Sequence, residues 1–163
     1  MKTLIVFSSR TGNTRKLAQT LKDLFGGEKT FCHIDEAPEP EGFDLIALGF
    51  WVQAGKPDPK SSAYLAKVSE ANLFLFATHG ASADSAHALN AMEQAKSLAA
   101  SARLAGTFHC AGEVNPDFLE NIRKKELPPP WIKDAPDAVG HPDQSDIDLL
   151  TEIVKEKLPE FLA

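Results

Sequence analysis

Short apolar segments alternate with amphipathic segments along the chain, and this alternation limits the fold more than any other feature. Strands are expected where β-forming residues cluster, and helices where apolar residues recur every three or four positions. The expected strands are Thr3–Phe7, Thr30–Ile34, Asp44–Gly49, Asn72–Ala77 and Leu104–Ala111. The expected helices are Asn13–Phe25, Ser61–Val68, Ser85–Ala102, Pro116–Lys125 and Asp146–Leu158, with Ser145 as the N-cap of the last. This order predicts an α/β fold, a doubly wound five-stranded parallel sheet with helices on both faces.

The length of 163 residues and the 43% hydrophobic content fit a single domain, residues 1–163, with its own core. The proline-containing segment Leu127–Gln144 is expected to be an irregular excursion. No apolar segment approaches the roughly 20 residues of a membrane helix. The first apolar run, Leu4–Phe7, is shorter than the core of a signal peptide. We therefore expect a cytoplasmic protein without membrane contact.

The net charge of −6 arises in the last third of the chain. The chain has 17 basic and 23 acidic residues. Residues 1–112 hold 11 basic and 11 acidic residues, so the remaining residues hold 6 basic and 12 acidic ones. An acidic surface argues against nucleic acid as a partner and favours partner proteins with basic docking surfaces. The alternative is that these charges only keep the protein dissolved. The cysteines and histidines show no metal-binding spacing, so no metal is expected.

A polar segment separates the first strand from the first helix. Its residues are Ser8, Ser9, Arg10, Thr11, Gly12, Asn13 and Thr14. Backbone N–H groups and hydroxyl groups that gather at a helix N-terminus suit a phosphate. The segment lacks the GxxxxGK[ST] pattern of nucleoside-triphosphate loops and the GxGxxG pattern of dinucleotide sites. The alternative is a well-capped helix start, for which one hydroxyl residue would suffice.

Ser9-Arg10-Thr11-Gly12-Asn13-Thr14 resembles the [ST]-x-T-G-x-T phosphate loop of the flavodoxin family, and it directly follows the first strand as in that family. The resemblance covers nearly the whole chain. It implies FMN bound non-covalently at the carboxyl ends of a sheet with strand order 2-1-3-4-5. In that order Cys32 and Cys110 lie on opposite edge strands, roughly 19 Å apart, too far for a disulfide.

The resemblance also implies flavin contacts from the loops after the third and fourth strands. After the third strand the candidates are Phe50, Trp51, Val52, Ala54 and Gly55, with Trp51 as the stacking residue. After the fourth strand they are Thr78, His79 and Gly80. The alternatives are that Phe50 and Trp51 fill the core at the sheet edge, and that His79 is merely solvated.

Many flavodoxins place a tyrosine in the loop after the fourth strand, whereas the tyrosine of this chain, Tyr64, is expected on the second helix. The second face of the flavin is therefore open, or covered by His79 or by Trp131 of the excursion. Phe108-His109-Cys110 and the Gly49–Pro57 segment also resemble a subgroup of the family from anaerobic bacteria, one member type of which is linked to bilirubin reduction.

Three functions are compatible with these patterns to different degrees. An FMN-binding electron-transfer protein is favoured, because the cofactor does the chemistry and no catalytic acid or base is needed. The alternative is an FMN-dependent oxidoreductase that acts directly on a planar acceptor such as a quinone or tetrapyrrole. A non-redox receiver domain is disfavoured, because the first strand ends in serines rather than acidic residues.

Overall fold

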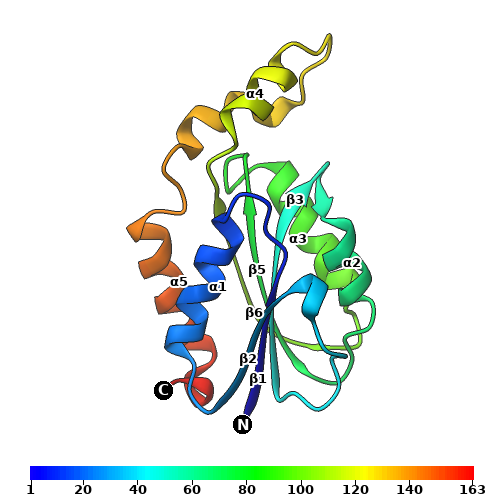
Figure 1. The fold of residues 1–163 in the computed structure, drawn as a ribbon, viewed down its shortest axis with the longest axis vertical. Helices are drawn as coiled ribbons and strands as arrows, with labels where there is room; N and C mark the ends of the chain where they lie inside the picture. The colour runs from blue at the N-terminus through cyan, green and yellow to red at the C-terminus, as the bar shows by residue number, and fades with distance from the viewer.

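The computed structural model describes residues 1–163 as a β-sheet between two layers of helices (Figure 1). The strands are β1 (Lys2–Phe7), β2 (Glu28–His33), β3 (Leu45–Gln53), β4 (Lys56–Pro57), β5 (Asn72–His79) and β6 (Arg103–Ala111). The helices are α1 (Asn13–Leu24), α2 (Pro59–Leu65), α3 (Ala86–Leu98), α4 (Pro116–Arg123) and α5 (Gln144–Lys157). The chain also forms four short 3-10 turns: η1 (Ile34–Glu36), η2 (Pro130–Lys133), η3 (Ala135–Ala138) and η4 (Pro159–Phe161).

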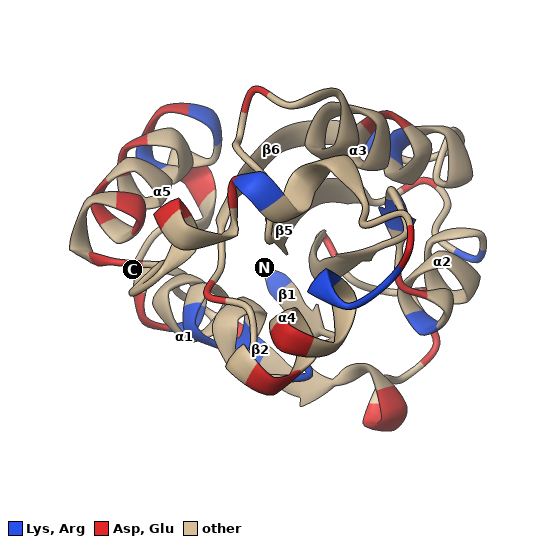
Figure 2. Cartoon of the chain, turned by 90° about the horizontal axis from the view of Figure 1, so that it is seen from above, with Lys and Arg blue, Asp and Glu red and all other residues tan.

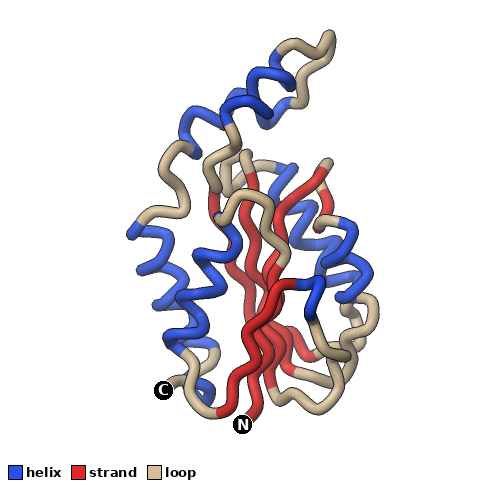
Figure 3. Tube along the Cα trace, viewed as in Figure 1, coloured by secondary structure: helices blue, strands red, loops and turns tan.

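Five strands run parallel in the order β2-β1-β3-β5-β6, and Figure 3 shows them side by side in red. Because β5 and β6 are the fourth and fifth expected strands, the order 2-1-3-4-5 is confirmed. The short strand β4 was not expected. It pairs with β3 in antiparallel fashion, with Val52 opposite Pro57 and Gln53 opposite Lys56. The predicted loop after the third strand is therefore a hairpin that turns at Ala54-Gly55.

The sheet is buried on both faces. Along β1, Leu4 and Val6 belong to the core on the side of α2 and α3, whereas Ile5 and Phe7 belong to the core on the side of α1 and α5. Strands covered on both faces carry continuous apolar runs rather than alternating ones, which explains the pattern of β1 and β5. No helix combines the length and the apolar composition that a membrane crossing requires.

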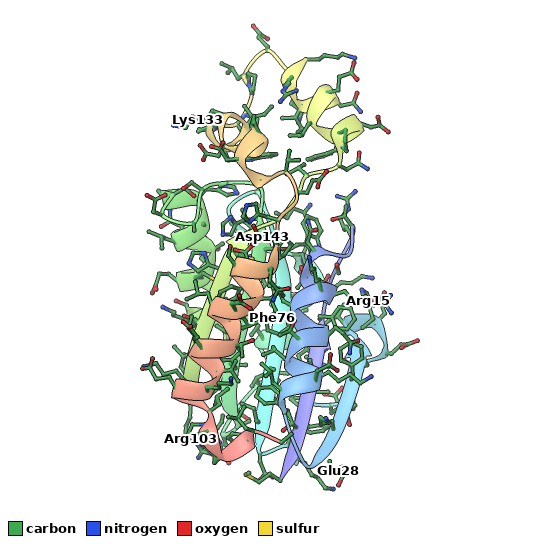
Figure 4. The ribbon with its side chains drawn as sticks, turned by 90° about the vertical axis from the view of Figure 1, so that its left-hand side faces the viewer. Arg15, Glu28, Phe76, Arg103, Lys133 and Asp143 are labelled. Carbon is green, nitrogen blue, oxygen red and sulfur yellow. The ribbon has the colours of Figure 1, made fainter.

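The packing between β3 and β5 depends on a glycine. Gly49 lies beside Phe76 in the parallel register, and a Cβ atom on Gly49 would be 2.2 Å from Cε2 of Phe76. Phe76 itself is fully buried and lies between the sheet and the layer of α1 and α5 (Figure 4). Any side chain at position 49 would displace this ring, so the carboxyl end of β3 is held close to β5.

Residues 113–141, called the arm below, extend past the carboxyl ends of the strands (Figure 1). Two hydrogen bonds close the base of the arm: Glu113 N–H donates to the carbonyl of His141 at 2.8 Å, and Gly140 N–H donates to Glu113 Oε2 at 2.9 Å. Within the arm α4 packs on η2 and buries Leu119 and Ile122. The expected irregular excursion therefore contains two 3-10 turns and joins α4 in one projecting unit.

Helix α5 begins earlier than predicted, and its N-cap is Asp143 rather than Ser145. Asp143 Oδ1 accepts hydrogen bonds from the backbone of Ser145 at 2.8 Å and of Asp146 at 3.2 Å, and Asp146 Oδ2 accepts one from Asp143 N–H at 2.8 Å. This reciprocal arrangement is a capping box, which the spacing Asp-x-x-Asp signals in the sequence.

Asp143→Ala should lower the free energy of unfolding by about 1 kcal/mol, because two N–H groups of the first turn lose their acceptor. Ser145→Ala is the matched control and should lower the free energy of unfolding by less, because the Ser145 hydroxyl only donates a hydrogen bond to Asp143 Oδ1 and does not accept one from the helix backbone. Urea unfolding of both variants measures the difference. A larger loss for Ser145→Ala would contradict the assignment of Asp143 as the N-cap.

The two cysteines are free thiols on the opposite edge strands β2 and β6. Burial raises the pKa of Cys110 strongly, and it raises the pKa of the half-buried Cys32 as well. We expect iodoacetamide to alkylate Cys32 first and Cys110 only upon unfolding, because the thiolate is the reactive form. Peptide mass spectrometry after timed labelling tests this order. A disulfide between the two would contradict the strand order itself.

Candidate functional site

The segment Ser8–Thr14 forms a loop at the carboxyl end of β1 and leads directly into α1. Gly12 is the N-cap, and its φ of 97° lies in the left-handed region that glycine adopts without strain. No side-chain cap is present at this helix start, and a Cβ atom on Gly12 would meet nothing within 4 Å. The N–H groups of the first turn and the positive end of the helix dipole therefore face a position that an anion can fill.

The hydroxyl groups of this loop have different partners. Ser9 Oγ accepts a hydrogen bond from Gly12 N–H at 3.1 Å and keeps its own proton to donate. Thr11 is exposed, and no protein group bonds to its hydroxyl. Thr14 Oγ1 is buried and lies 2.9 Å from Oγ1 of Thr78 at the end of β5. Ser9 and Thr11 thus keep hydroxyl protons that no protein group accepts, whereas Thr14 joins the loop to the sheet.

Backbone contacts fix the loop relative to its neighbours. Ser8 N–H donates to the carbonyl of Gly49 at 2.9 Å, which ties the loop to β3. Asn13 Nδ2 donates to the carbonyl of Glu113 at 2.9 Å, which ties it to the base of the arm. The loop therefore has a defined shape before any ligand binds, which lowers the entropic cost of binding.

The end of β3 contributes an aromatic ring beside the loop. Trp51 is half-buried, and Cζ of Arg10 lies 5.2 Å from the centre of its ring, a cation–π distance. Phe50 is fully buried among the core residues, which favours the alternative interpretation that it fills the core. Val52 is half-buried on the strand, and Ala54 and Gly55 form the hairpin turn with φ values of 51° and 75°.

The end of β5 is two residues longer than predicted. Thr78 and His79 belong to the strand, because they pair with Cys110 and Ala111 of β6. Both are buried, so only Gly80 belongs to the following loop. The expected contact residues of this loop are consequently strand residues whose side chains face protein.

The buried His79 and the half-buried His109 form a hydrogen-bonded pair. His79 Nδ1 lies 2.9 Å from the carbonyl oxygen of Ala81, and His79 Nε2 lies 3.0 Å from Nδ1 of His109. A carbonyl oxygen only accepts, so Nδ1 of neutral His79 carries the proton and Nε2 accepts one from His109. The pair links β6 to the bend after β5 and holds that bend in place.

Burial keeps this pair neutral. Desolvation, together with the nearby His109 and His87, lowers the pKa of His79 to about 4. Desolvation also lowers the pKa of His109, and Lys96 acts in the same direction. The polar groups at the end of β5 therefore act near neutral pH as fixed hydrogen-bonding groups rather than as charges.

Two pockets flank the ends of the strands. A pocket of about 510 Å³ opens beside the phosphate loop on the side of β2, between Arg10, Arg15 and His33. A second, of about 300 Å³, lies under the arm and is bounded by His109, Asp134 and His141. Neither Trp51 nor Gly80 lines these two pockets.

Sequence reasoning did not place His87 or His109 beside the loop after β5, whereas it offered Trp131 as one possible cover of the flavin. His109 carried one signal, a polar residue inside an apolar strand. The position of Trp131 beside Gly80 could not be derived from the sequence, because it depends on how the arm folds back over the sheet. A Cβ atom on Gly80 would lie 3.1 Å from Cζ3 of Trp131, so these residues touch although fifty positions separate them.

Comparisons with known proteins identify the family and the fold of the chain. Residues 4–155 match the family model described as a flavodoxin domain. The chain is 28% identical over 166 residues to a flavodoxin-like domain-containing protein BilS from Clostridioides difficile strain CD3, which covers 90% of each chain.

Solved structures share the fold at low sequence identity. A flavodoxin from Streptococcus pneumoniae TIGR4 matches with a TM-score of 0.63 at 13% identity, over 98% of this chain and 99% of that one. A flavoprotein from Lactobacillus acidophilus NCFM, solved in complex with FMN, matches with a TM-score of 0.54 at 17% identity, over 66% of this chain and 92% of that one. The family model spans residues 4–155, which include the loop Ser8–Thr14 and most or all of each of the five parallel strands. The chain therefore belongs to the flavodoxin family.

Proposed function

We propose that this protein is an FMN-dependent electron carrier that passes electrons between redox partners. Family membership makes it an FMN flavoprotein, and bound FMN supplies the one- and two-electron chemistry. The observation that carries the proposal is the start of α1, where N–H groups without a side-chain cap meet the hydroxyls of Ser9 and Thr11. These are the groups that would hold the FMN phosphate, and they need no basic side chain to do so.

The ring of FMN would lie beyond this loop, between the ends of β3 and β5. Trp51 would stack on it, and the turn at Ala54-Gly55 offers backbone groups at its edge. At the end of β5, the backbone of the loop that begins at Gly80 would border the ring. The side chains of His79 and Thr78 are held by protein partners and would support this backbone rather than contact the ring.

The acidic residues indicate where a partner protein would approach. Residues 142–163, which include α5, hold six acidic and two basic residues. The arm holds six acidic and four basic residues. Figure 2, viewed onto the carboxyl ends of the strands, shows acidic positions on α5 and on the arm. Partners with basic docking surfaces would therefore approach from the side of α5. The cytoplasmic location and the single-domain organisation stay predictions.

The second candidate function is direct reduction of a planar acceptor such as a quinone or tetrapyrrole. It is favoured by the lack of an aromatic residue in the loop from Gly80 to Ser85, and by the position of Tyr64, whose hydroxyl is bonded to the carbonyl of Pro38 far from this loop. A flavin face without a covering side chain from that loop leaves more room for a second flat molecule.

Two measurements on the purified protein test these functions. FMN added to the flavin-free protein should give a bound, yellow complex that stays together in gel filtration and loses its colour upon anaerobic photoreduction. The reduced complex should then be oxidised by partner proteins, with no NAD(P)H consumption when menadione or bilirubin is the acceptor. NAD(P)H-dependent turnover without an added reductase would favour the enzyme. A protein that carries no FMN through gel filtration after incubation with excess FMN would exclude both functions.

A further inference from the structure

The arm fits closely against the loop after β5. Trp131 lies in η2 of the arm, and its six-membered ring occupies the space that a side chain at Gly80 would fill. A Cβ atom on Gly80 would be 3.1 Å from Cζ3 of Trp131 and 2.6 Å from Cγ2 of Val114, which also belongs to the arm. The absence of a side chain at position 80 is therefore what allows the arm to dock here.

A hydrogen bond fastens the same region of the arm. Ser82 N–H donates to Oδ2 of Asp134 at 3.1 Å, so the loop after β5 is bonded to the residue that ends η2. The carboxylate also belongs to the wall of the 300 Å³ pocket beneath the arm. Steric fit at Gly80 and a charge-assisted hydrogen bond at Ser82 thus hold the arm at two neighbouring points.

The base of the arm is fastened to the phosphate loop and its helix. Asn13 Nδ2 donates to the carbonyl of Glu113, and Lys16 Nζ donates to the carbonyl of Pro142, directly after the arm. Asn13 and Lys16 both lie in the first turn and a half of α1, the helix that would face the phosphate. The arm therefore connects the phosphate end of the site with the loop after β5.

Trp131 also reaches toward the hairpin between β3 and β4. Its ring centre is 6.4 Å from that of His87, at an interplanar angle of 37°. A Cβ atom on Gly55, in the turn of the hairpin, would be 3.7 Å from Nδ1 of His87. Trp131 and His87 therefore span the space between the two loops that would border the flavin ring.

We propose that the arm completes the flavin site and that Trp131 is its aromatic wall on the side of the loop after β5. This inference rests on the proposed FMN function. Figure 1 shows the arm above the strand ends, and Figure 4 shows Lys133, of the same 3-10 turn as Trp131, at that end of the molecule. An aromatic ring from the arm supplies the stacking surface that the loop from Gly80 to Ser85 lacks.

The chain contains two tryptophans, Trp51 and Trp131, so phenylalanine variants of each separate their contributions. An indole in contact with a flavin quenches flavin emission, whereas phenylalanine does so poorly. We expect the emission of bound FMN to rise in Trp131→Phe and in Trp51→Phe, and to rise most in the double variant. FMN affinity of Trp131→Phe should fall about twofold to tenfold.

Leu127→Ala is the matched control, because Leu127 lies on the same arm with 87% of its surface exposed. It should change neither emission nor affinity. Trp51→Phe provides a second test that leaves the arm intact: its flavin should remain partly quenched by Trp131. Emission that depends on Trp51 alone would overturn the proposal while the FMN function stands. A wild-type protein that binds no FMN would overturn both.

Discussion

Riboflavin should bind to this protein at least about a hundredfold more weakly than FMN. The only chemical difference between the two ligands is the phosphate, and the structure offers it the uncapped start of α1 together with the hydroxyls of Ser9 and Thr11. A hydrogen bond to a charged group contributes roughly 1.5–3 kcal/mol, so two such bonds already correspond to that ratio. Isothermal titration calorimetry at one fixed salt concentration measures both affinities.

A pair of threonine variants locates this effect. Thr11→Ala should weaken FMN binding and leave riboflavin binding unchanged, because it removes one donor to the phosphate. Thr20→Ala is the control: Thr20 lies on α1, the helix that follows the loop, and its hydroxyl donates to the carbonyl of Lys16. Equal affinities for riboflavin and FMN in the wild type would show that the loop does not hold a phosphate, and the flavin site would have to be sought elsewhere.

The parts of the structure that the sequence predicted are those encoded by local patterns. Continuous apolar runs marked the buried strands, and a glycine among hydroxyl residues marked the loop between β1 and α1. Each signal lies within about ten neighbouring residues, so no knowledge of the tertiary structure was needed. The strand order came from resemblance to a family rather than from the runs themselves.

The hairpin between β3 and β4 was missed because its turn lacks the usual signal. Two-residue hairpins with positive φ at both turn positions are typically Asn-Gly or Asp-Gly. Here Ala54 adopts a φ of 51°, which an alanine adopts at some cost in strain. Gly55 and Pro57 in the same segment suggested an irregular loop, and only the pairing of Gln53 with Lys56 shows the strand.

Contacts between distant residues explain the remaining omissions in the candidate site. His79 and His109 meet because β5 and β6 are neighbours in a particular register, and Trp131 meets Gly80 because the arm folds back. Neither contact follows from spacing along the chain. The same holds for Gly49, whose missing side chain makes room for Phe76 of the neighbouring strand.

The histidine pair should make the protein less stable at mildly acidic pH. In the unfolded chain His79 has its ordinary pKa near 6.5, whereas burial lowers the pKa in the folded protein to about 4. Between these values the unfolded state binds a proton that the folded state excludes. The stabilisation that comes from neutral His79 is therefore fully present above about pH 6.5 and is lost as the pH falls toward 4. Below pH 4 His79 causes no further change in the free energy of unfolding.

The free energy of unfolding should accordingly fall by about 2 kcal/mol between pH 7 and pH 5 through His79 alone. The lowered pKa of His109 adds to this loss in the same direction. The carboxylates with lowered pKa, such as Asp35 and Asp143, release their stabilisation only at lower pH, so this interval reports on the histidines. Urea unfolding at several pH values in one buffer series gives the slope.

His79→Asn should flatten this slope even where it lowers stability overall, because asparagine does not titrate. Leu127→Ala is the control, because it changes an exposed residue and leaves every histidine in place, and it should keep the wild-type slope. An unchanged slope in His79→Asn would mean that His79 takes up its proton in the folded state. The bend at Gly80 would then lose its neutral pair within the folded protein, and FMN affinity should fall between pH 7 and pH 5. If the pair acts as described, it stays neutral in the folded protein down to about pH 4, so the bend should cause no loss of FMN affinity over the interval in which stability falls.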